Sequence, residues 1–328
     1  MLVLSRADVE ELLDVDLLID ALARAMVDVA AARASMPPRV AAMVEERDGL
    51  LGSMPAYLPS AGVLETKLVS VFPRNAGTGV PTHQAVIVAF DPATGSPAAI
   101  MDGTWITEIR TAAGSALATR LLARPESRVL AILGTGAQAR SHARAVTRVL
   151  DFAEVRVAGR DPARAAALAR ELSDQLGLPA TGSGSFQEGL EGADVVCATT
   201  HPADPVVRRE WLDPGVHVNS VGWSLAGREV DAETVRDALV VVEARAAALA
   251  PPPAGANDLT WAIRDGVITA DHVQAEVGEI VAGTRPGRTS PDQITLYKSV
   301  GIAAQDAAAA ALVLAEADRR GAGQRVEL

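Results

Sequence analysis

The sequence has very few cysteines, aromatic residues and lysines, and each shortage limits what the protein can be. Cys197 is the only cysteine among 328 residues, which excludes an intrachain disulfide and a cysteine-rich zinc site. Aromatic residues make up 3% of the chain, so we expect a core of Ala, Val, Leu and Ile. Only two of the 30 Lys and Arg residues are lysines, Lys67 and Lys298, so a lysine at either position needs a reason.

Two kinds of segment are missing as well. No uncharged stretch reaches the roughly 20 residues that a membrane-spanning helix needs. The start of the chain, MLVLSRADVEELL, lacks the basic and then apolar order of a signal peptide.

The five histidines have no metal-binding spacing, and the net charge of −11 argues against a nucleic-acid partner. These observations predict a cytoplasmic protein that binds small molecules, with no metal and no membrane contact.

The first third of the chain is predicted as a mixed α+β region. A capping box opens a first helix after Ser5, and a second amphipathic helix covers about Val15 to Ala32. Apolar, β-branched runs follow at 63–72 and 82–90, before a helical pattern at 104–123. We therefore expect a mainly antiparallel sheet with helices packed on it.

From residue 124 onward the pattern changes to alternating strands and helices. Buried strand-like runs at 128–134, 154–159 and 193–200 are separated by helical stretches. This alternation is typical of a doubly wound parallel sheet. The end of the chain, ITLYKSVGIAAQDAAAAALVLAEADRR, is predicted as one long helix.

Two domains are the expectation for a chain of this length. We predict an α/β protein with a Rossmann-type, doubly wound parallel sheet at 124–299. A smaller α+β domain is predicted at 1–123, completed by a C-terminal helix at 300–328.

A glycine-rich turn follows the first strand of the Rossmann-type region. In ILGTGAQA, Gly134, Gly136 and Ala139 form the G-x-G-x-x-A pattern directly after a strand and before a helix. The first Gly permits the tight turn, the second lets a pyrophosphate approach the backbone, and the small third residue lets helix and strand pack closely. The context predicts a dinucleotide site, with Ala137 and Gln138 on the pyrophosphate turn.

The next strand ends in AGRDPAR, and its tip bears on the choice of cofactor. NAD sites usually place an acidic residue at this tip to accept the ribose 2′-OH. Here Arg160 stands at the tip, and an arginine can bind a 2′-phosphate through two hydrogen bonds. We predict NADP rather than NAD, although a shift of one residue would give the role to Asp161.

Three cations of the first region occur in unusual settings: Arg39 after two prolines, Lys67 inside a strand, and Arg110 in ITEIRTAAG. Strand alternation places Glu65 on the same face as Lys67. A lysine is costly to bury unless it contacts an anion. The three cations together predict a carboxylate pocket, and a structural ion pair is the alternative for each of them.

Six separated motifs resemble the ornithine cyclodeaminase/mu-crystallin family, and the resemblance runs nearly from end to end. The motifs are PPR, TKLVSVFPRN, GTGAQA, VNSVG, GEIVAG and ITLYKSVGIAAQD. The resemblance implies a homodimer that pairs through the sheets of its substrate-binding domains. It also implies an NAD or NADP cofactor and chemistry at a carbon–nitrogen bond beside a carboxylate.

The resemblance also implies roles for individual residues. Arg39, Lys67 and Arg110 match positions that bind the substrate carboxylate and its surroundings. Ser299 and Val300 would close the site from the last helix, with Val300 next to the substrate. The other residues that match cofactor-binding positions are Thr82, Ala137, Gln138, Thr200, Val221 and Gly222.

One departure separates this chain from true cyclodeaminases. Those enzymes carry an aspartate two residues after the VG pair, where this sequence has Ser224. A serine cannot be the carboxylate that accepts a proton or balances an ammonium, so cyclodeamination is disfavoured and the ketimine reductase and mu-crystallin members are the better match. The proton for an imine could come from Lys67 or from a water held by Ser224. His83 is a further candidate for this role, and a core histidine or a dimer contact is the alternative interpretation. Lys298 adjoins Ser299 at the site, and the alternative interpretation of Lys298 is an ion pair on a helix surface.

The sequence therefore predicts an NAD(P)H-dependent oxidoreductase that reduces a small, cyclic α-imino acid to the amino acid. Three alternatives stay open: an alanine-type amino-acid dehydrogenase, an ornithine or lysine cyclodeaminase, and a binding protein of the mu-crystallin type that holds NADP without turnover.

Overall fold

The computed structural model describes residues 1–224, 227–251 and 254–327, so Leu328, the last residue of the predicted C-terminal helix, lies outside them. The chain forms two compact units. Unit 1 combines Met1–Arg110 with the segment from Ile302 onward, and unit 2 is Thr111–Gly301. The sequence patterns predict these divisions at 123 and 299 instead. Helix α3 (Gly103–Leu122) continues through the first division without a break, so the helical pattern gives no sign of a boundary at residue 110.

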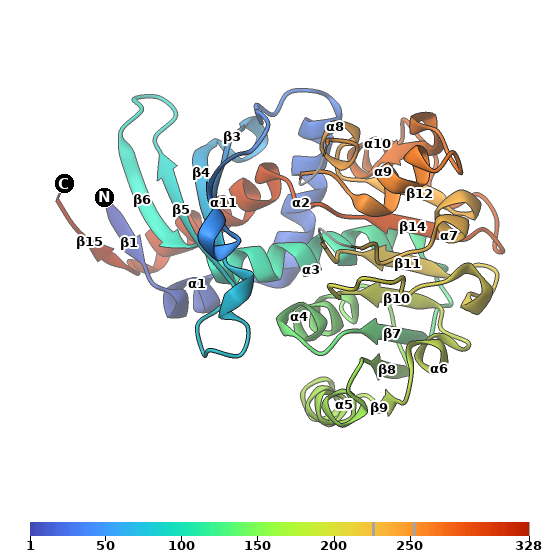
Figure 1. Ribbon diagram of the computed structural model, residues 1–328. Helices are drawn as coiled ribbons and strands as arrows, with labels where there is room; N and C mark the ends of the chain where they lie inside the picture. The colour runs from blue at the N-terminus through green and yellow to red at the C-terminus, as the bar shows by residue number, and fades with distance from the viewer. Residues whose placement is uncertain (225–226, 252–253, 328) are drawn as a thin grey trace. The chain divides into compact units, whose positions relative to one another are not determined.

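Unit 1 is built on a seven-stranded sheet in the order β15-β1-β6-β5-β4-β3-β2. Neighbouring strands run antiparallel, except that β1 and β6 are parallel, so the predicted α+β region is confirmed (Figure 1). The strands are β1 (Leu2–Leu4), β2 (Val40–Val44), β3 (Gly49–Leu58), β4 (Val63–Val71), β5 (His83–Phe90), β6 (Pro97–Asp102) and β15 (Gln324–Arg325). The helices are α1 (Arg6–Leu12), α2 (Val15–Ala30) and α11 (Ala303–Arg320).

Helix α11 covers one face of this sheet. It packs on β3 and β4 and against α2, and its alanines from Ala307 to Ala310 are buried. Small side chains let the helix backbone approach the sheet closely. On β4, Glu65 and Lys67 are buried whereas Leu68 is exposed, which confirms the predicted strand alternation. The face under α11 therefore contains two ionisable side chains.

Unit 2 contains an eight-stranded sheet in the order β13-β12-β14-β11-β10-β7-β8-β9. All neighbouring strands are parallel, so the predicted doubly wound, Rossmann-type sheet is confirmed. The strands are β7 (Val129–Leu133), β8 (Glu154–Ala158), β9 (Ala180–Ser183), β10 (Val195–Ala198), β11 (His217–Ser220), β12 (Leu239–Val242), β13 (Val273–Glu276) and β14 (Thr295–Lys298). The helices are α4 (Ala137–Val146), α5 (Pro162–Leu176), α6 (Phe186–Leu190), α7 (Ala232–Asp237), α8 (Arg245–Ala248), α9 (Asn257–Arg264) and α10 (Val277–Val281).

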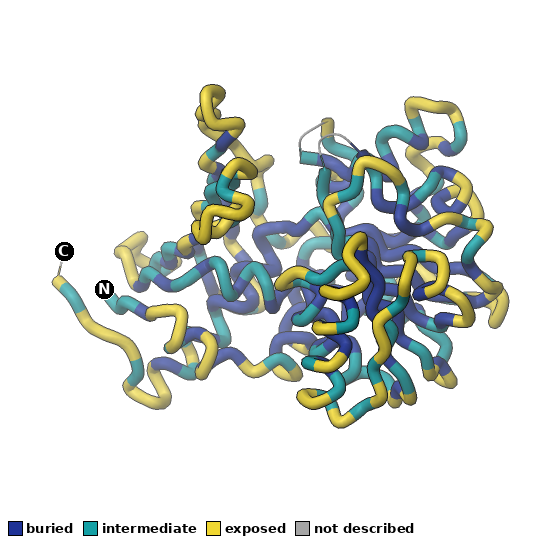
Figure 2. Tube along the Cα trace, turned by 60° about the horizontal axis from the view of Figure 1, so that its bottom comes forward, coloured by how far each residue is buried: buried dark blue, intermediate teal, exposed yellow. Residues whose placement is uncertain are grey.

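The strand order of unit 2 reverses between β7 and β10. From β7 the chain continues outward to β8 and β9, and it then returns to place β10 on the other side of β7. In open α/β sheets, ligands bind beyond the carboxyl ends of the strands at such a reversal. The central strands are buried along most of their length (Figure 2), so their carboxyl ends are held by a rigid core.

The predicted C-terminal helix was wrong in two respects. Residues Thr295–Lys298 form strand β14, which lies between β11 and β12 (Figure 1). Helix α11 begins at Ala303, because Gly301 adopts a φ of 70° that interrupts a right-handed helix. The helix ends at Arg320, and the chain then pairs with β1 through β15. The alanines after residue 303 extended the helical prediction over a short, apolar TLYK strand.

Within the part of the chain that the structure describes, no helix combines the length and the apolar character needed to span a bilayer.

Candidate active site

The glycine-rich turn of unit 2 connects the carboxyl end of β7 to helix α4. Gly134 has a φ of 121°, which a residue with a Cβ rarely adopts. A Cβ at this position would also lie 2.7 Å from Thr199 Oγ1, so the turn passes directly against the segment after β10. Ala139 is fully buried, and its small side chain lets α4 pack on the sheet.

The start of α4 fits the phosphates of a dinucleotide. Gly136 is the N-cap residue and supplies no side-chain cap, so the first N–H groups of the helix are available to a ligand. A Cβ at Gly136 would meet no atom within 4 Å, so protein does not fill the side from which a phosphate would approach. Ala137 is exposed and Gln138 is partly exposed at this turn. The geometry is therefore suited to an anionic ligand.

The tip of β8 separates the two candidates for ribose recognition. Asp161 is the N-cap of α5, and its Oδ1 accepts hydrogen bonds from the N–H groups of Ala163 and Arg164. One oxygen of its carboxylate is therefore already used by the helix. Arg160 is exposed at the same tip. This division of roles agrees with the sequence-based preference for a 2′-phosphate.

Unit 1 contains a buried ion cluster that the sequence predicted only in part. Lys67 Nζ lies 2.7 Å from Asp306 Oδ2, and Arg110 Nε donates to Asp306 Oδ1 at 3.0 Å. Arg110 also donates to Gln305 Oε1 at 3.1 Å. Asp306 is fully buried, Lys67 is 1% exposed and Arg110 is 6% exposed. One carboxylate from α11 thus joins two of the three predicted cations.

Burial and charge act in opposite directions on this cluster. Burial raises the pKa of Asp306, but the adjacent Lys67 and Arg110 outweigh it and hold that pKa below its usual value. Burial lowers the pKa of Lys67 to about 8, an effect that Asp306 opposes and Arg110 reinforces. Lys67 is therefore a cation at neutral pH that can release its proton within the physiological range.

Two further ionisable side chains lie near the cluster. Burial, together with the negative charge of Asp306, raises the pKa of Glu65 to about 9, and neither of its carboxyl oxygens has a hydrogen-bond partner among the described residues. Burial and the two cations lower the pKa of His83 to about 4. Glu65 is thus a neutral acid and His83 a neutral imidazole at pH 7. A neutral imidazole is a poor acid, which argues against His83 as the proton donor.

The protonation states leave the cluster with a positive charge. Lys67 and Arg110 carry two positive charges, Asp306 carries one negative charge, and Glu65 and His83 are neutral. One positive charge is therefore not compensated inside the cluster, which favours the binding of one anionic group.

Arg39 and Thr82 lie in exposed segments of unit 1. Arg39 directly precedes β2, and Thr82 directly precedes β5, where its carbonyl oxygen accepts a hydrogen bond from the Phe72 N–H. The cluster around Asp306 consists of Lys67 and Arg110, so the proposed contribution of Arg39 to carboxylate binding stays a prediction.

The segments after β10 and β11 are joined by Glu229, which is 1% exposed. Its Oε1 accepts hydrogen bonds from the N–H and the hydroxyl of Thr200, at 2.6 and 2.7 Å. Its Oε2 accepts hydrogen bonds from the hydroxyl of Ser220 and the N–H of Gly222, at 2.7 and 2.8 Å. Val221, between them, donates its N–H to the Ala198 carbonyl. Glu229 thus brings the predicted cofactor positions Thr200 and Gly222 onto one carboxylate.

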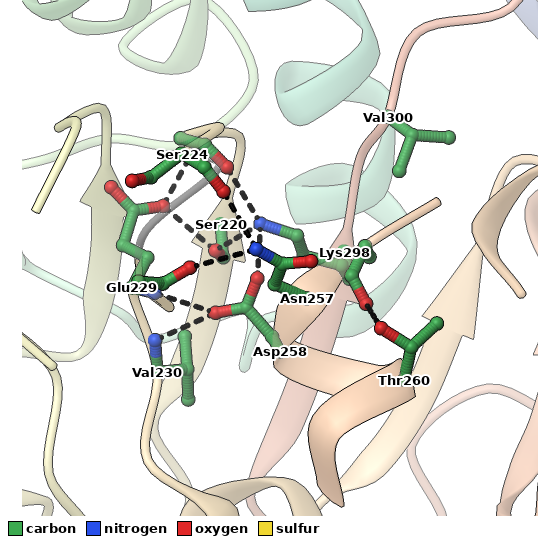
Figure 3. A network of polar contacts seen from close by, with 12 residues as sticks. Ser220, Ser224, Glu229, Val230, Asn257, Asp258, Thr260, Lys298 and Val300 are labelled. Atoms are coloured by element: carbon green, nitrogen blue, oxygen red, sulfur yellow. Dashed lines mark hydrogen bonds and ion pairs between the residues drawn. The ribbon is translucent and has the colours of Figure 1, made fainter. Parts of the chain in front are cut away.

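Lys298 forms an ion pair, as its alternative interpretation had it, but the pair is buried in β14 and does not lie on a helix surface. Its Nζ lies 2.8 Å from Asp258 Oδ2 and donates to Ser220 Oγ and to the Gly222 carbonyl oxygen, at 3.0 and 2.9 Å. Figure 3 shows this network, in which Ser220 lies between Glu229 and Lys298 and Asp258 lies below them. All three protons of the ammonium group have an acceptor.

Ser299 and Val300 belong to the loop between β14 and α11, which corrects their predicted place in the last helix. The Ser299 hydroxyl donates to Glu243 Oε1 at 2.5 Å, and the Val300 N–H donates to Glu243 Oε2 at 3.1 Å. Val300, Trp223 and Ser224 line one small cavity next to Gly222. Asn257 Nδ2 donates to the Ser224 carbonyl oxygen and fixes this part of the cavity wall.

Sequence reasoning missed the buried acids that organise both groups of residues. Asp306 stands alone in the alanine-rich run AAQDAAAAALVLA, and a single acid in such a helix signals a buried cation partner. Glu229 and Asp258 carry no comparable signal, because exposed acids are common in loops and at helix starts.

Comparison with known proteins agrees with this geometry. Residues 1–321 match the model of the ornithine cyclodeaminase/mu-crystallin family. The chain belongs to this family. It is 39% identical to ketimine reductase mu-crystallin from Mus musculus. The alignment extends over 278 residues and covers 84% of this chain and 83% of that protein.

Two solved structures of relatives are similar along the whole chain. Thermococcus litoralis Δ1-pyrroline-2-carboxylate reductase, solved in complex with NADH and L-proline, has a TM-score of 0.95 and 38% identity, and covers 99% of this chain and 100% of that one. An archaeal alanine dehydrogenase dimer with bound NAD has a TM-score of 0.90 and 32% identity, and covers 100% of this chain and 99% of that one. The resemblance predicted from the six sequence motifs and the Rossmann-type fold are thereby confirmed.

Proposed function

We propose that the protein is an NADPH-dependent reductase that converts a small, cyclic α-imino acid into the corresponding amino acid. The observation that carries this proposal is the buried Lys67–Asp306–Arg110 cluster, which keeps one uncompensated positive charge. The family assignment adds relatives named as ketimine reductase and as Δ1-pyrroline-2-carboxylate reductase.

The cluster can hold the carboxylate of such a substrate. Asp306 is the one acceptor that contacts Lys67 Nζ among the described residues, so two of the three ammonium protons are available. Lys298 differs in this respect, because Ser220, Gly222 and Asp258 occupy its three protons. Lys67 therefore combines a positive charge with free donors. Arg110 is fixed by Asp306 and Gln305, and Arg39 would add a third cation.

Lys67 can also supply the proton that imine reduction consumes. When bound, the dinucleotide supplies a hydride to the imine carbon, and the nitrogen must gain one proton to become an amine. Lys67, with its pKa lowered to about 8 by burial, gives up a proton more readily than an exposed lysine. It regains that proton from solvent after the product leaves. Ser224, which lines the cavity of unit 2, would hold a water as a second possible donor.

One feature favours NADPH over NADH as the cofactor, and a second favours imine reduction over cyclodeamination. Arg160 is exposed at the β8 tip and carries a positive charge that suits a 2′-phosphate, whereas Asp161 uses one carboxyl oxygen to cap α5. Ser224 stands where cyclodeaminases carry an aspartate, so ring closure with release of ammonia lacks its carboxylate. Gly136, Ala137 and Gln138 would bind the pyrophosphate through backbone N–H groups at the start of α4, and Gly134, whose N–H donates to the Ala158 carbonyl oxygen, would shape the turn.

A homodimer that pairs through the outer face of the unit 1 sheet is part of this proposal. Val40, Ser53, Leu68 and Val86 are direct neighbours across β2, β3, β4 and β5, on the face opposite α11. Val40 is 66% exposed and Val86 is 42% exposed. An exposed row of three apolar residues and one serine, without charge, is typical of a protein interface, and the archaeal alanine dehydrogenase relative is named as a dimer.

The test is NADPH oxidation with three substrates: pyrroline-2-carboxylate, piperideine-2-carboxylate, and pyruvate with ammonia. We expect turnover with a cyclic imine in the absence of ammonia. Turnover that requires pyruvate and ammonia would identify an alanine-type dehydrogenase instead. Release of ammonia from ornithine with catalytic NAD would identify a cyclodeaminase, and tight NADPH binding without oxidation would identify a binding protein.

A further inference from the structure

Gly222 is held from both sides by buried ions of opposite charge. Its N–H donates to Glu229 Oε2 at 2.8 Å, and its carbonyl oxygen accepts a hydrogen bond from Lys298 Nζ at 2.9 Å. A Cβ at Gly222 would collide with the Thr200 carbonyl oxygen and with the Glu229 carboxylate, so only glycine fits here. Both peptide units of Gly222 are therefore fixed in orientation.

The two ions are themselves fixed by neighbouring groups. Asp258 pairs with Lys298 through Oδ2 and accepts hydrogen bonds from the N–H groups of Glu229 and Val230 through Oδ1, at 2.7 and 2.8 Å. Ser220 donates its hydroxyl to Glu229 and accepts a hydrogen bond from Lys298. Figure 3 shows that these groups form one connected network. Glu229 and Lys298 are therefore each held by several partners.

The network lies at the carboxyl ends of the central strands, where a ligand is expected. Thr200 follows β10 and Gly222 follows β11, and these adjacent parallel strands end on the same side as β7 and its glycine-rich turn. Gly222 leads into Trp223 and Ser224, which line the cavity. A fixed Gly222 therefore determines where the cavity wall stands.

Lysine suits this place better than arginine. An ammonium presents three protons in a tetrahedral arrangement, which matches the carboxylate, the hydroxyl and the carbonyl around Lys298. A planar guanidinium presents its donors in one plane and cannot reach the same three acceptors. The second of the two lysines of the chain thus has a geometric reason.

We propose that Glu229 and Lys298 are positioning residues, which act as a charge clamp on Gly222 and hold the cofactor-side wall of the active site in its reactive arrangement. This inference rests on the proposed function for its kinetic consequence. The clamp itself is a property of unit 2. Pre-organised groups contribute to the rate because misplacement by about 1 Å can cost about 100-fold in turnover.

A matched control lies at the amino ends of the strands of the same sheet. Asp194 also holds backbone groups, because its Oδ2 accepts hydrogen bonds from the N–H groups of Arg128 and Val129, and it pairs with Arg124 at 2.6 Å. It directly precedes β10, at the amino ends of the strands. Asp194→Asn should therefore loosen the sheet without reaching the cavity.

The experiment compares Glu229→Gln, Lys298→Met and Lys298→Arg with Asp194→Asn. We expect each clamp variant to lower kcat for imine reduction at least tenfold and to change the Kd for NADPH less than threefold, because the glycine-rich turn and Arg160 are intact. Asp194→Asn should lower the melting temperature and leave kcat unchanged. Clamp variants whose kcat stays within threefold of that of Asp194→Asn would overturn the proposal.

Amide hydrogen exchange tests the clamp without any turnover, so failure of the proposed function stays distinguishable. NADPH should slow exchange in peptides that contain Gly222 in the wild-type protein and should slow it at least tenfold less in the clamp variants. Ser220→Ala removes one contact from each ion and keeps both charges, so it provides a milder variant if the others fail to fold. Equal protection of Gly222 by NADPH in wild type and Ser220→Ala would contradict the clamp.

Discussion

Lys67 and Asp306 form an ion pair with an Nζ–Oδ2 distance of 2.7 Å in which the side chains are 2% and 0% exposed. The pair joins strand β4 to helix α11, whose residues are far apart in the sequence. The proposed function gives a reason why a chain that uses arginine for nearly all of its positive charges keeps a lysine here. An arginine would stay charged under all conditions, whereas a buried lysine can bind an anion and also release a proton.

Lys67→Arg tests the chemical role of this lysine. The variant keeps the positive charge, but an arginine does not release a proton at neutral pH. We expect kcat for imine reduction to fall about 100- to 10,000-fold, the usual contribution of a general acid. Arg320→Lys, in an exposed ion pair with Glu316, is the control and should keep full activity. A kcat within threefold of wild type would remove Lys67 from the proton transfer.

Asp306→Asn tests the cohesion of the buried cluster. The change leaves Lys67 and Arg110 buried without their carboxylate, so we expect the free energy of unfolding to fall by about 3–5 kcal/mol in urea titrations. Glu10→Gln removes the exposed pair with Arg6 and should cost less than about 1 kcal/mol. The double variant Asp306→Asn with Lys67→Met should regain part of the loss, and a loss below about 1 kcal/mol in the single variant would argue against a tight cluster.

Glu65→Gln tests the neutral buried acid. Burial raises the pKa of Glu65 in the folded protein to about 9, whereas the unfolded chain has a pKa of about 4.5. The contribution of Glu65 to stability is therefore fully present below pH 4.5 and is lost as the pH rises toward 9, because the unfolded state gives up the proton first. Glutamine does not titrate.

We expect the stability of Glu65→Gln relative to wild type to increase steadily from pH 5 to pH 8, as measured by urea unfolding at each pH. Glu10→Gln, at an exposed position, should show no such trend. A constant difference across this range would mean that Glu65 is ionised in the folded protein.

Arg160→Ala tests the preference for NADPH. Loss of charge-assisted hydrogen bonds to a 2′-phosphate should raise the KM for NADPH about 10- to 100-fold and leave the KM for NADH nearly unchanged. Asp161→Ser is the control, because serine keeps the N-cap of α5 while removing the carboxylate. Equal effects of Arg160→Ala on both dinucleotides would contradict 2′-phosphate recognition.

Leu68→Lys tests the proposed dimer interface. Leu68 lies in the middle of the outer sheet face, between Ser53 and Val86. A lysine there would place charges against each other across a twofold interface, so we expect monomers in analytical ultracentrifugation. Leu17→Lys, at a 60% exposed position on α2, should leave the association state unchanged. A dimer of wild-type affinity in Leu68→Lys would place the interface elsewhere.

The sequence by itself determined the features that depend on local patterns. The capping box at Ser5, the alternation around Lys67 and the glycine-rich turn at Gly134 all depend on neighbouring residues, and the structure reproduces each of them. The six family motifs predicted the family along nearly the whole chain, and the match of residues 1–321 confirms it. The Rossmann-type sheet follows from the alternation of strands and helices, which is also a local signal.

Only the tertiary structure decided which charges meet. Asp306 contacts Lys67 and Arg110 because α11 packs on the sheet of unit 1, and no spacing in the sequence encodes that pairing. Strand β14 was hidden because four residues beside an alanine-rich helix give too short a pattern, and its place is fixed by hydrogen bonds to β11 and β12. Burial, which lowers the pKa of Lys67 and raises that of Glu65, is likewise a property of the packed fold and not of either residue alone.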